Sequence, residues 1–129
     1  MRKEVNKEIE NTEKWITYAK GGTFNKWHGN LWAVVNWENS GNDIKNFVDE
    51  NGKQKSRPQN ISLYFKEGIT YSASGSKGAS YRLLPKGCIF DVGGSSIFSI
   101  KEYKNIYYTM SFFNSNISKY TSLYLLLYK

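Results

Sequence analysis

The sequence has very little of the chemistry that metal centres, disulfides and nucleophilic sites need: one Cys, one His and two Pro in 129 residues. The single cysteine, Cys88, has no partner for an internal disulfide, and its apolar surroundings predict a buried, inert thiol. With His28 as the only histidine, neither a His-based metal cluster nor a Cys–His nucleophile pair is supported. We therefore predict no catalytic residues, no metal and no cofactor bound by this chain.

The sequence also lacks a long hydrophobic run and a pair of acidic residues at catalytic spacing. The longest apolar tract, residues 123–128, is too short to cross a bilayer, and the charged N-terminus is not a signal peptide. The absence of both, with a single cysteine, predicts a cytoplasmic protein without a membrane partner. Asp91 is the best single acidic candidate, but a turn-capping role is more ordinary for it.

What the sequence does have is aromatic and basic residues. Seven Phe, ten Tyr and four Trp make a packed core feasible and argue against disorder. Eighteen Lys and Arg against eleven Asp and Glu give a formal charge of +7. A basic balance attracts phosphate backbones, although many soluble proteins are also basic. Composition alone leaves a solvated surface and a nucleic-acid interface both open.

Residues 1–129 are predicted to form one domain of the α+β class. We expect a helical lead-in over residues 1–12, a sheet-rich core over 13–98 in which the sheet is twisted and mostly antiparallel, and a helical segment over 105–129. Strands are predicted at residues 14–20, 31–37, 81–84 and 88–92, with a hairpin or kinked strand within 61–74. A short helix capped by Ser40 or Asn42 is expected to run through Val48, followed by a polar loop over residues 50–60.

The stretch from Lys20 to Asn30 organises the chain, because it combines glycines, lysines and aromatic residues in one loop. Its Gly21-Gly22 pair, like Gly93-Gly94, lacks a nucleotide-binding fingerprint, so turns or duplex-facing loops are the better interpretation. We expect Trp32 and Trp37 to be core anchors. The residues predicted to contact DNA phosphates or bases, with small neighbours that let the backbone approach, are Lys20, Lys26, Trp27, His28, Asn30, Lys77, Arg82 and Lys86.

Several blocks in order carry a resemblance to a known family. The run KGGTFNKWHGN at residues 20–30, VVNWENSGNDIK at 34–45, YFKEGITYS at 64–72 and YRLLPKGCIFDVGGSSIF at 81–98 resemble a region of the PglX-type adenine-specific DNA methyltransferases. These enzymes belong to BREX phage-defence systems and are related to type IIG restriction-modification enzymes. The resemblance continues into the tail at residues 108–119 and covers most of residues 13–125. Departures are His28, where the family usually has Tyr, and Phe113, where it usually has Leu.

This resemblance implies a target-recognition domain, C-terminal to a catalytic core that binds S-adenosylmethionine. The chain itself has neither the Asn/Asp-Pro-Pro-Tyr/Phe tetrapeptide nor the glycine-rich cofactor loop, so as a fragment it is expected to bind double-stranded DNA without methylating it. The last apolar face stops without a cap, which suggests a truncated chain. The alternative is a protein-interaction module that docks on a separate methyltransferase subunit through Tyr120, Leu123, Tyr124 and Leu127.

Overall fold

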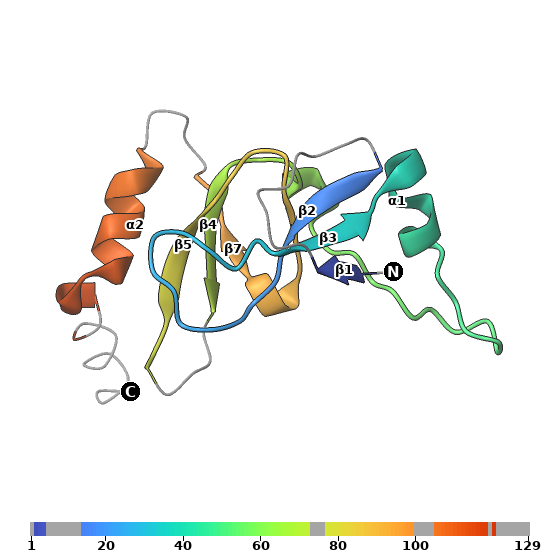
Figure 1. The fold of residues 1–129 in the computed structure, drawn as a ribbon, viewed down its shortest axis with the longest axis horizontal. Coiled ribbons are helices and arrows are strands. Elements are labelled where there is room, and N and C mark those ends of the chain that lie inside the picture. Colours follow the sequence, from blue (N-terminus) through green and yellow to red (C-terminus); the bar gives the residue numbers. More distant parts are fainter. Residues whose placement is uncertain (1, 5–13, 73–76, 100–104, 119, 121–129) are drawn as a thin grey trace.

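The computed structural model describes residues 2–4, 14–72, 77–99, 105–118 and 120. Figure 1 shows helix α2 (Ile106–Asn114) at one end, then one sheet, then a second sheet, and helix α1 (Glu38–Lys45) at the other end. No helix of this described part is long and apolar enough to cross a membrane. The elements in chain order are β1 (Arg2–Glu4), β2 (Trp15–Ala19), β3 (Ala33–Asn36), α1 (Glu38–Lys45), the 3₁₀ turn η1 (Ile61–Leu63), β4 (Gly68–Ser72), β5 (Ser80–Leu84), β6 (Ile89–Phe90), the 3₁₀ turn η2 (Val92–Gly94), β7 (Ser96–Ile97) and α2 (Ile106–Asn114).

The predicted α+β class with mostly antiparallel strands is confirmed, but the strands form two sheets where one was expected. The first sheet has the order β1-β3-β2-β6. Strands β2 and β3 pair antiparallel, as the predicted strands at 14–20 and 31–37 suggested. Strand β6 joins β2 in parallel, with Tyr18 opposite Ile89. Residues far apart in the sequence therefore complete this sheet.

The predicted helix over residues 2–12 is wrong for residues 2–4, which form β1. This strand pairs antiparallel with β3, placing Lys3 opposite Val34. Backbone pairing with the open edge of β3 overrides the weak helical periodicity of so short a segment. The remaining positions of that prediction, including Val5 and Ile9, lie outside the described residues.

The second sheet is antiparallel, in the order β5-β4-β7. Strands β5 and β6 match the two strands predicted around the turn at Pro85-Lys86-Gly87, yet they do not form a hairpin, because β5 belongs to the second sheet and β6 to the first. Of the hairpin or kinked strand predicted within 61–74, β4 is the one strand that forms over the described positions 61–72. Before it lie η1 and Phe65, whose φ of 66° turns the chain.

The helices differ from the prediction at their ends. Helix α1 begins at Glu38 and ends at Lys45, so Phe47 and Val48 lie beyond it and are exposed. Neither Ser40 nor Asn42 caps it, because Asn39, Ser40 and Gly41 all have left-handed φ values and form its irregular first turn. Helix α2 begins where the Asn105 side chain accepts a hydrogen bond from the Tyr107 N–H at 2.8 Å. It is interrupted after Asn114, as the sequence predicted.

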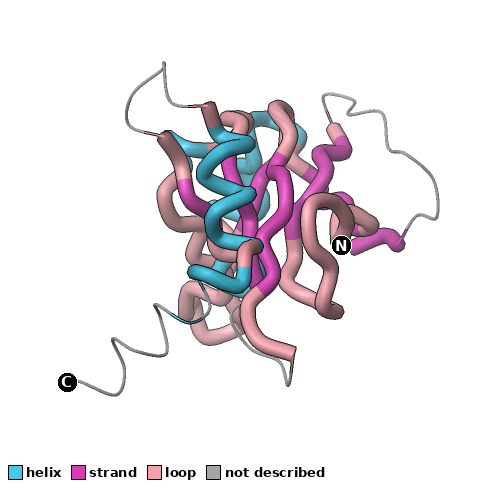
Figure 2. The backbone as a smooth tube through the Cα atoms, turned by 90° about the vertical axis from the view of Figure 1, so that its left-hand side faces the viewer, coloured by secondary structure: helices cyan, strands magenta, loops and turns pink. Residues whose placement is uncertain are grey.

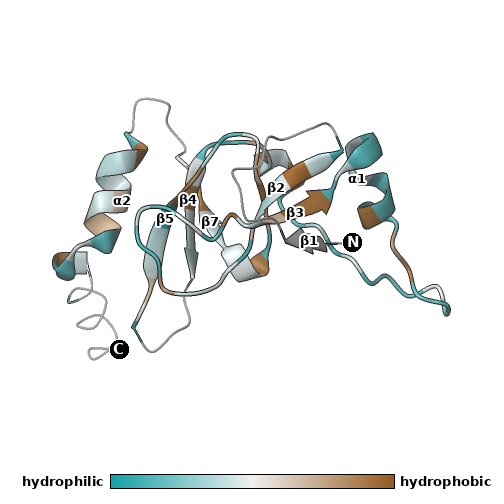
Figure 3. Ribbon diagram, viewed as in Figure 1, coloured by the Kyte–Doolittle hydropathy of each residue, from teal (hydrophilic) through white to brown (hydrophobic). Residues whose placement is uncertain are grey.

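The core lies where the two sheets meet, and its apolar side chains come from both. Figure 3 shows hydrophobic residues concentrated in the central strands, whereas most of α1 and of the segment after it is hydrophilic. Trp37 is a core anchor as predicted, with its ring 5.3 Å from that of Tyr64 in an edge-on arrangement. Trp32 is not, because it is 37% exposed. The buried cluster consists of Ile16, Tyr18, Ala19, Ala33, Trp37, Tyr64, Leu84, Cys88, Ile89 and Phe90.

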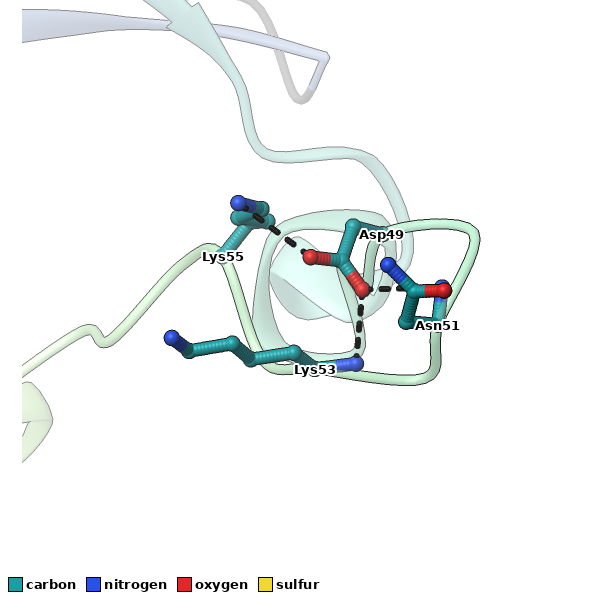
Figure 4. A network of polar contacts seen from close by, with 4 residues as sticks. All are labelled: Asp49, Asn51, Lys53 and Lys55. Atoms are coloured by element: carbon teal, nitrogen blue, oxygen red, sulfur yellow. Dashed lines mark hydrogen bonds and ion pairs between the residues drawn. The ribbon is translucent and has the colours of Figure 1, made fainter.

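The polar loop predicted at residues 50–60 projects from α1 and is folded by Asp49 (Figure 4). One carboxylate oxygen of Asp49 accepts from the backbone N–H groups of Asn51 and Lys53, and the other lies 3.2 Å from the Lys55 ammonium. These interactions, led by the Lys53 N–H, lower the pKa of Asp49 from its ordinary 3.8. A capped turn thus gives the loop a defined shape without adding a strand to either sheet.

Candidate nucleic-acid interface

The loop between β2 and β3 crosses the outer edge of β5. The Trp27 N–H donates to the Tyr81 carbonyl at 2.9 Å, and the Leu83 N–H donates to the Trp27 carbonyl at 3.0 Å. Trp27 reaches this position with a φ of 74°. An edge strand presents unpaired backbone groups, so this one-residue bridge satisfies two of them. The organising loop of the sequence is therefore part of the second sheet.

Asn114, the last residue of α2, holds the same edge. Its side-chain amide accepts from the Tyr81 N–H at 3.2 Å and donates to the Tyr81 carbonyl at 2.8 Å. The Lys26 ammonium donates to the Asn114 carbonyl at 2.7 Å, a favourable place for a cation because helix carbonyls point there. The rings of Tyr81 and Phe113 stack at 4.9 Å. Figure 2 shows α2 lying in front of the strands in this contact.

Asn30 is buried and shapes the loop from inside. Its amide nitrogen donates to the Thr23 carbonyl at 3.0 Å, and its amide oxygen accepts from the Asn25 side chain at 2.9 Å. Its φ of 60° lies in the left-handed region that asparagine tolerates better than most residues. In this structure the Asn30 side chain is not accessible to a duplex, so its role is to hold the loop.

Arg82 is fully buried, in contrast to the DNA contact predicted for it. One terminal nitrogen donates to the Asn25 carbonyl, at 3.1 Å, and to both oxygens of Ser80, while the other donates to the Ser72 hydroxyl at 2.9 Å. Among the described residues, none accepts a hydrogen bond from its Nε. Burial lowers the pKa of the guanidinium below its usual value, although an arginine remains charged at neutral pH. Arg82 therefore ties the loop to β4 and β5 rather than facing solvent.

The other predicted contacts are at least partly accessible. Trp27 is 49% exposed, and His28, Lys77 and Lys86 are exposed as well. Lys77 precedes β5 and Lys86 follows it, so the strand separates them by about 17 Å. Lys20 is half-buried, with its ammonium 5.6 Å from the centre of the Trp32 ring. The accessible predicted residues are therefore not gathered in one loop, because Lys77 and Lys86 flank β5 whereas Lys20 lies beside Trp32.

The two glycine pairs, predicted as separate turns, pack against each other. A Cβ built on Gly21 would lie 1.8 Å from the Gly93 carbonyl oxygen, and one on Gly94 would lie 2.4 Å from the Ala19 carbonyl oxygen. No side chain fits at such distances. Glycine is required here because two backbone segments touch where the first sheet meets the second.

Asp91 and Cys88, the two groups weighed as chemical candidates, have structural surroundings. The Asp91 carboxylate accepts from the Gly93 and Gly94 N–H groups and from the Tyr18 hydroxyl, so the turn-capping interpretation is confirmed. Cys88 is buried as predicted, and burial raises the pKa of its thiol from 9.0 to about 11. Within the described residues, no three His, Cys, Asp or Glu side chains gather as metal ligands would.

Sequence reasoning missed two residues that organise this interface, Ser72 and Asn114. Ser72 bonds the buried guanidinium of Arg82 and also accepts from the Gly22 N–H at 3.4 Å. The alternation of strand side chains places Ser72, Ser80 and Arg82 on one face of the second sheet, which was a usable signal. The sequence marks Asn114 only as an interruption of the helical segment, because no local pattern shows which strand edge its side-chain amide will bond.

A search of protein-family models finds no match to this chain. Two related proteins are similar over most of its length. Adenine-specific methyltransferase PglX of Lacticaseibacillus casei (strain Zhang) is 39% identical over 112 residues, which are 86% of this chain and 9% of that protein. Adenine-specific methyltransferase BrxX of Escherichia coli O9:H4 (strain HS) is 36% identical over 110 residues, which are 84% of this chain and 8% of that protein. The chain thus spans less than a tenth of the length of either relative.

Proposed function

We propose that this chain, whose sequence is related to a segment of adenine-specific methyltransferases, binds duplex DNA and contributes target recognition to such an enzyme in a BREX phage-defence or restriction-modification system. The observation that carries the proposal is this relation, which extends over more than four fifths of the chain. Methyl transfer and S-adenosylmethionine binding are assigned to other parts of the enzyme, because this sequence holds neither motif. We place its action in the cytoplasm, because the two relatives come from bacteria and bacterial DNA lies there.

The accessible side chains along β5 support a backbone-directed mode of binding. Lys77 and Lys86 stand at the two ends of the strand, and Trp27 and His28 lie beside its middle. Within the described residues, neither lysine makes a salt bridge, so both ammonium groups are available to phosphates. A strand length of about 17 Å spans several phosphates of one DNA strand, which gives the two ends separate contacts.

The proposal is tested by the salt dependence of binding to a labelled duplex, measured by fluorescence anisotropy between 50 and 200 mM salt. We expect affinity to fall steeply, and Lys86→Gln to lower the slope of log K against log salt by about 1. Lys53→Gln is the matched control, because it removes the same charge from the loop beyond α1. No binding at any salt, or an affinity independent of salt, would contradict the proposal.

A second candidate function is docking on a separate methyltransferase subunit through α2. Its face is rich in aromatic residues, with Tyr108 78% exposed and Phe112 53% exposed, and Tyr120 beyond the helix is 70% exposed. The helix itself, Ile106–Asn114, contains no charged residue. Of the four residues first expected in this role, Leu123, Tyr124 and Leu127 lie outside the described residues.

Docking and DNA binding separate in one pair of measurements. The chain is mixed with a methyltransferase that lacks the matching segment and run on size-exclusion chromatography, beside the anisotropy assay. If the docking function holds, we expect the two proteins to co-elute, and we expect Tyr108→Ser and Phe112→Ser to abolish this co-elution. Unchanged DNA affinity in these variants would keep the two surfaces distinct. Separate elution with intact DNA binding would remove the docking function.

A further inference from the structure

A hollow of about 400 Å³ lies where the start of the β2–β3 loop, the end of β4 and the segment after β6 meet. Its walls include Gly21, Gly22 and Gly93 from the two glycine pairs described above. The side chains and glycines that line it and matter for its chemistry are Lys20, Gly22, Ser72 and Gly93.

The Ser72 hydroxyl is set up to donate into this hollow. Its oxygen accepts from Arg82 at 2.9 Å and from the Gly22 N–H at a longer 3.4 Å. A hydroxyl has two acceptor positions and one hydrogen, so both acceptor positions are used and only the hydrogen remains. No acceptor for that hydrogen is found in the part of the chain that the structure describes.

Positive charge surrounds this donor. Lys20 lines the hollow, with its ammonium 5.6 Å from the centre of the Trp32 ring, and the buried Arg82 guanidinium donates to Ser72 from behind. Within the described residues, neither cation makes a salt bridge. Asp91, which precedes the wall residue Val92, is an acidic group close in the chain, and its carboxylate already accepts from Gly93, Gly94 and Tyr18. The local balance of two cations against one satisfied carboxylate favours an anion.

We propose that this hollow binds one tetrahedral oxyanion, a phosphate group, with the Ser72 hydroxyl and the Lys20 ammonium as its direct donors. Arg82 is a positioning residue, because it fixes the orientation of Ser72 and adds charge from behind. That the phosphate belongs to DNA rests on the proposed function, whereas the preference for a phosphate anion does not.

The first arm of the test uses inorganic phosphate with the whole chain. Amide signals are followed by NMR during a titration with sodium phosphate at constant ionic strength. We expect saturable shifts centred on Gly22 and Ser72, weakened at least fivefold by Lys20→Gln and unchanged by Lys53→Gln. Shifts spread evenly over exposed lysines, or equal binding in Lys20→Gln, would overturn the site.

The Ser72 hydroxyl is tested separately, because Ser72→Ala also removes an acceptor from buried Arg82. Its melting temperature is measured with its phosphate titration. A folded Ser72→Ala variant that loses the shifts supports the site, and one that binds phosphate normally overturns the role of the hydroxyl. If the variant does not fold, the result with Lys20→Gln decides alone.

The second arm distinguishes free phosphate from the DNA backbone. Lys20→Gln is expected to lower the salt slope of duplex binding by about 1, with no change for Lys53→Gln. Phosphate binding without this effect on DNA would assign the site to a free phosphate. If Lys20→Gln changes neither phosphate binding nor duplex binding, the site is overturned and the proposed function is left standing.

Discussion

At the scale of single residues, the most consequential position is Arg82, a cation buried without a carboxylate partner. Its charge is held by the Asn25 carbonyl and by the hydroxyls of Ser72 and Ser80. Burying a charge is costly unless hydrogen bonds replace water, so these acceptors are as important as the arginine itself. Arg82 links the loop to the sheet, and the accessible candidates Trp27 and His28 depend on it for their placement.

Replacing Arg82 with alanine is expected to destabilise the protein by about 3 kcal/mol, because it empties a packed site and leaves buried acceptors unpaired. The measurement is urea unfolding followed by tryptophan fluorescence. Arg57→Ala is the control, because Arg57 is exposed in the loop beyond α1. Equal midpoints for the two variants would show that Arg82 does not link loop and sheet.

The wrong predictions for single residues arise mainly because the burial of a side chain depends on distant parts of the chain. An arginine is exposed in most proteins, so the sequence favoured a DNA contact for Arg82. Its burial depends on a loop more than fifty positions away that supplies an acceptor, and no local pattern encodes that partner. Trp37 was predicted correctly because it directly follows β3, whereas Trp32 directly precedes β3 and lies at the surface.

At the scale of elements, two different groups hydrogen-bond the outer edge of β5: the Trp27 backbone and the Asn114 side chain. Both bond the backbone of Tyr81, and together they attach the loop and α2 to one strand. An exposed edge strand invites pairing with another chain, so this closure protects the second sheet. It also sets where the accessible residues of the proposed interface lie.

Asn114→Ala is expected to loosen α2 without unfolding the first sheet, because it leaves the Tyr81 N–H without its side-chain acceptor, at a cost of about 1–3 kcal/mol. Hydrogen exchange is expected to become faster in α2 and β5 and to stay unchanged in β2 and β3. Asn114→Asp keeps the acceptor and loses the donor, so an intermediate effect is expected. Uniformly faster exchange over all strands would contradict a local role.

The contact between the glycine pairs predicts a sharp difference between neighbouring positions. Gly21→Ala is expected to destabilise by about 1–3 kcal/mol, because its methyl group would overlap the Gly93 carbonyl. Gly22→Ala is expected to cost much less, since its nearest neighbour, the Asn30 side chain, would lie at 3.4 Å. Thermal melting of both variants gives the comparison. A similar loss of stability in both variants would show that the close backbone contact at Gly21 is not what makes alanine unfavourable there.

At the scale of the whole molecule, the sequence predicted the elements better than their arrangement. β2, β4, β5 and α2 have local patterns of alternation or helical spacing, and each was predicted close to its place. The division into two sheets was not, because β5 and β6 are neighbours in the chain but pair with different partners. Of the candidate site, the exposed residues were accessible to prediction, whereas the hollow at Ser72 required three distant segments to be placed together.

The whole molecule is expected to lose stability as pH rises above 9. Burial raises the pKa of Cys88 to about 11 from 9.0, and burial also raises the pKa values of Tyr64 and Tyr81 above 10.0. The unfolded chain releases these protons at lower pH than the folded chain does. Stability is therefore fully present below the unfolded values and falls as pH rises through the folded ones.

Urea midpoints measured from pH 8 to pH 11 check this expectation. Cys88→Ala removes the group with the lowest unfolded pKa, so the part of the decline that begins near pH 9 is expected to shrink in this variant. Because the substitution also shortens a buried side chain, the comparison is of slopes with pH and not of absolute midpoints. A midpoint that rises with pH, or a slope unaffected by Cys88→Ala, would contradict the assignment.

The parallel pairing of β6 with β2 has a consequence for how the chain is made. Tyr18 and Ala19 meet Ile89 and Phe90, so the first sheet is completed only after the segment containing β4 and β5 has been synthesised. Until then a nascent chain on the ribosome presents one edge of β2 without its final partner. Such long-range pairing slows folding and leaves a strand open to association. We therefore expect a chain arrested before residue 89 to be the form most in need of a chaperone.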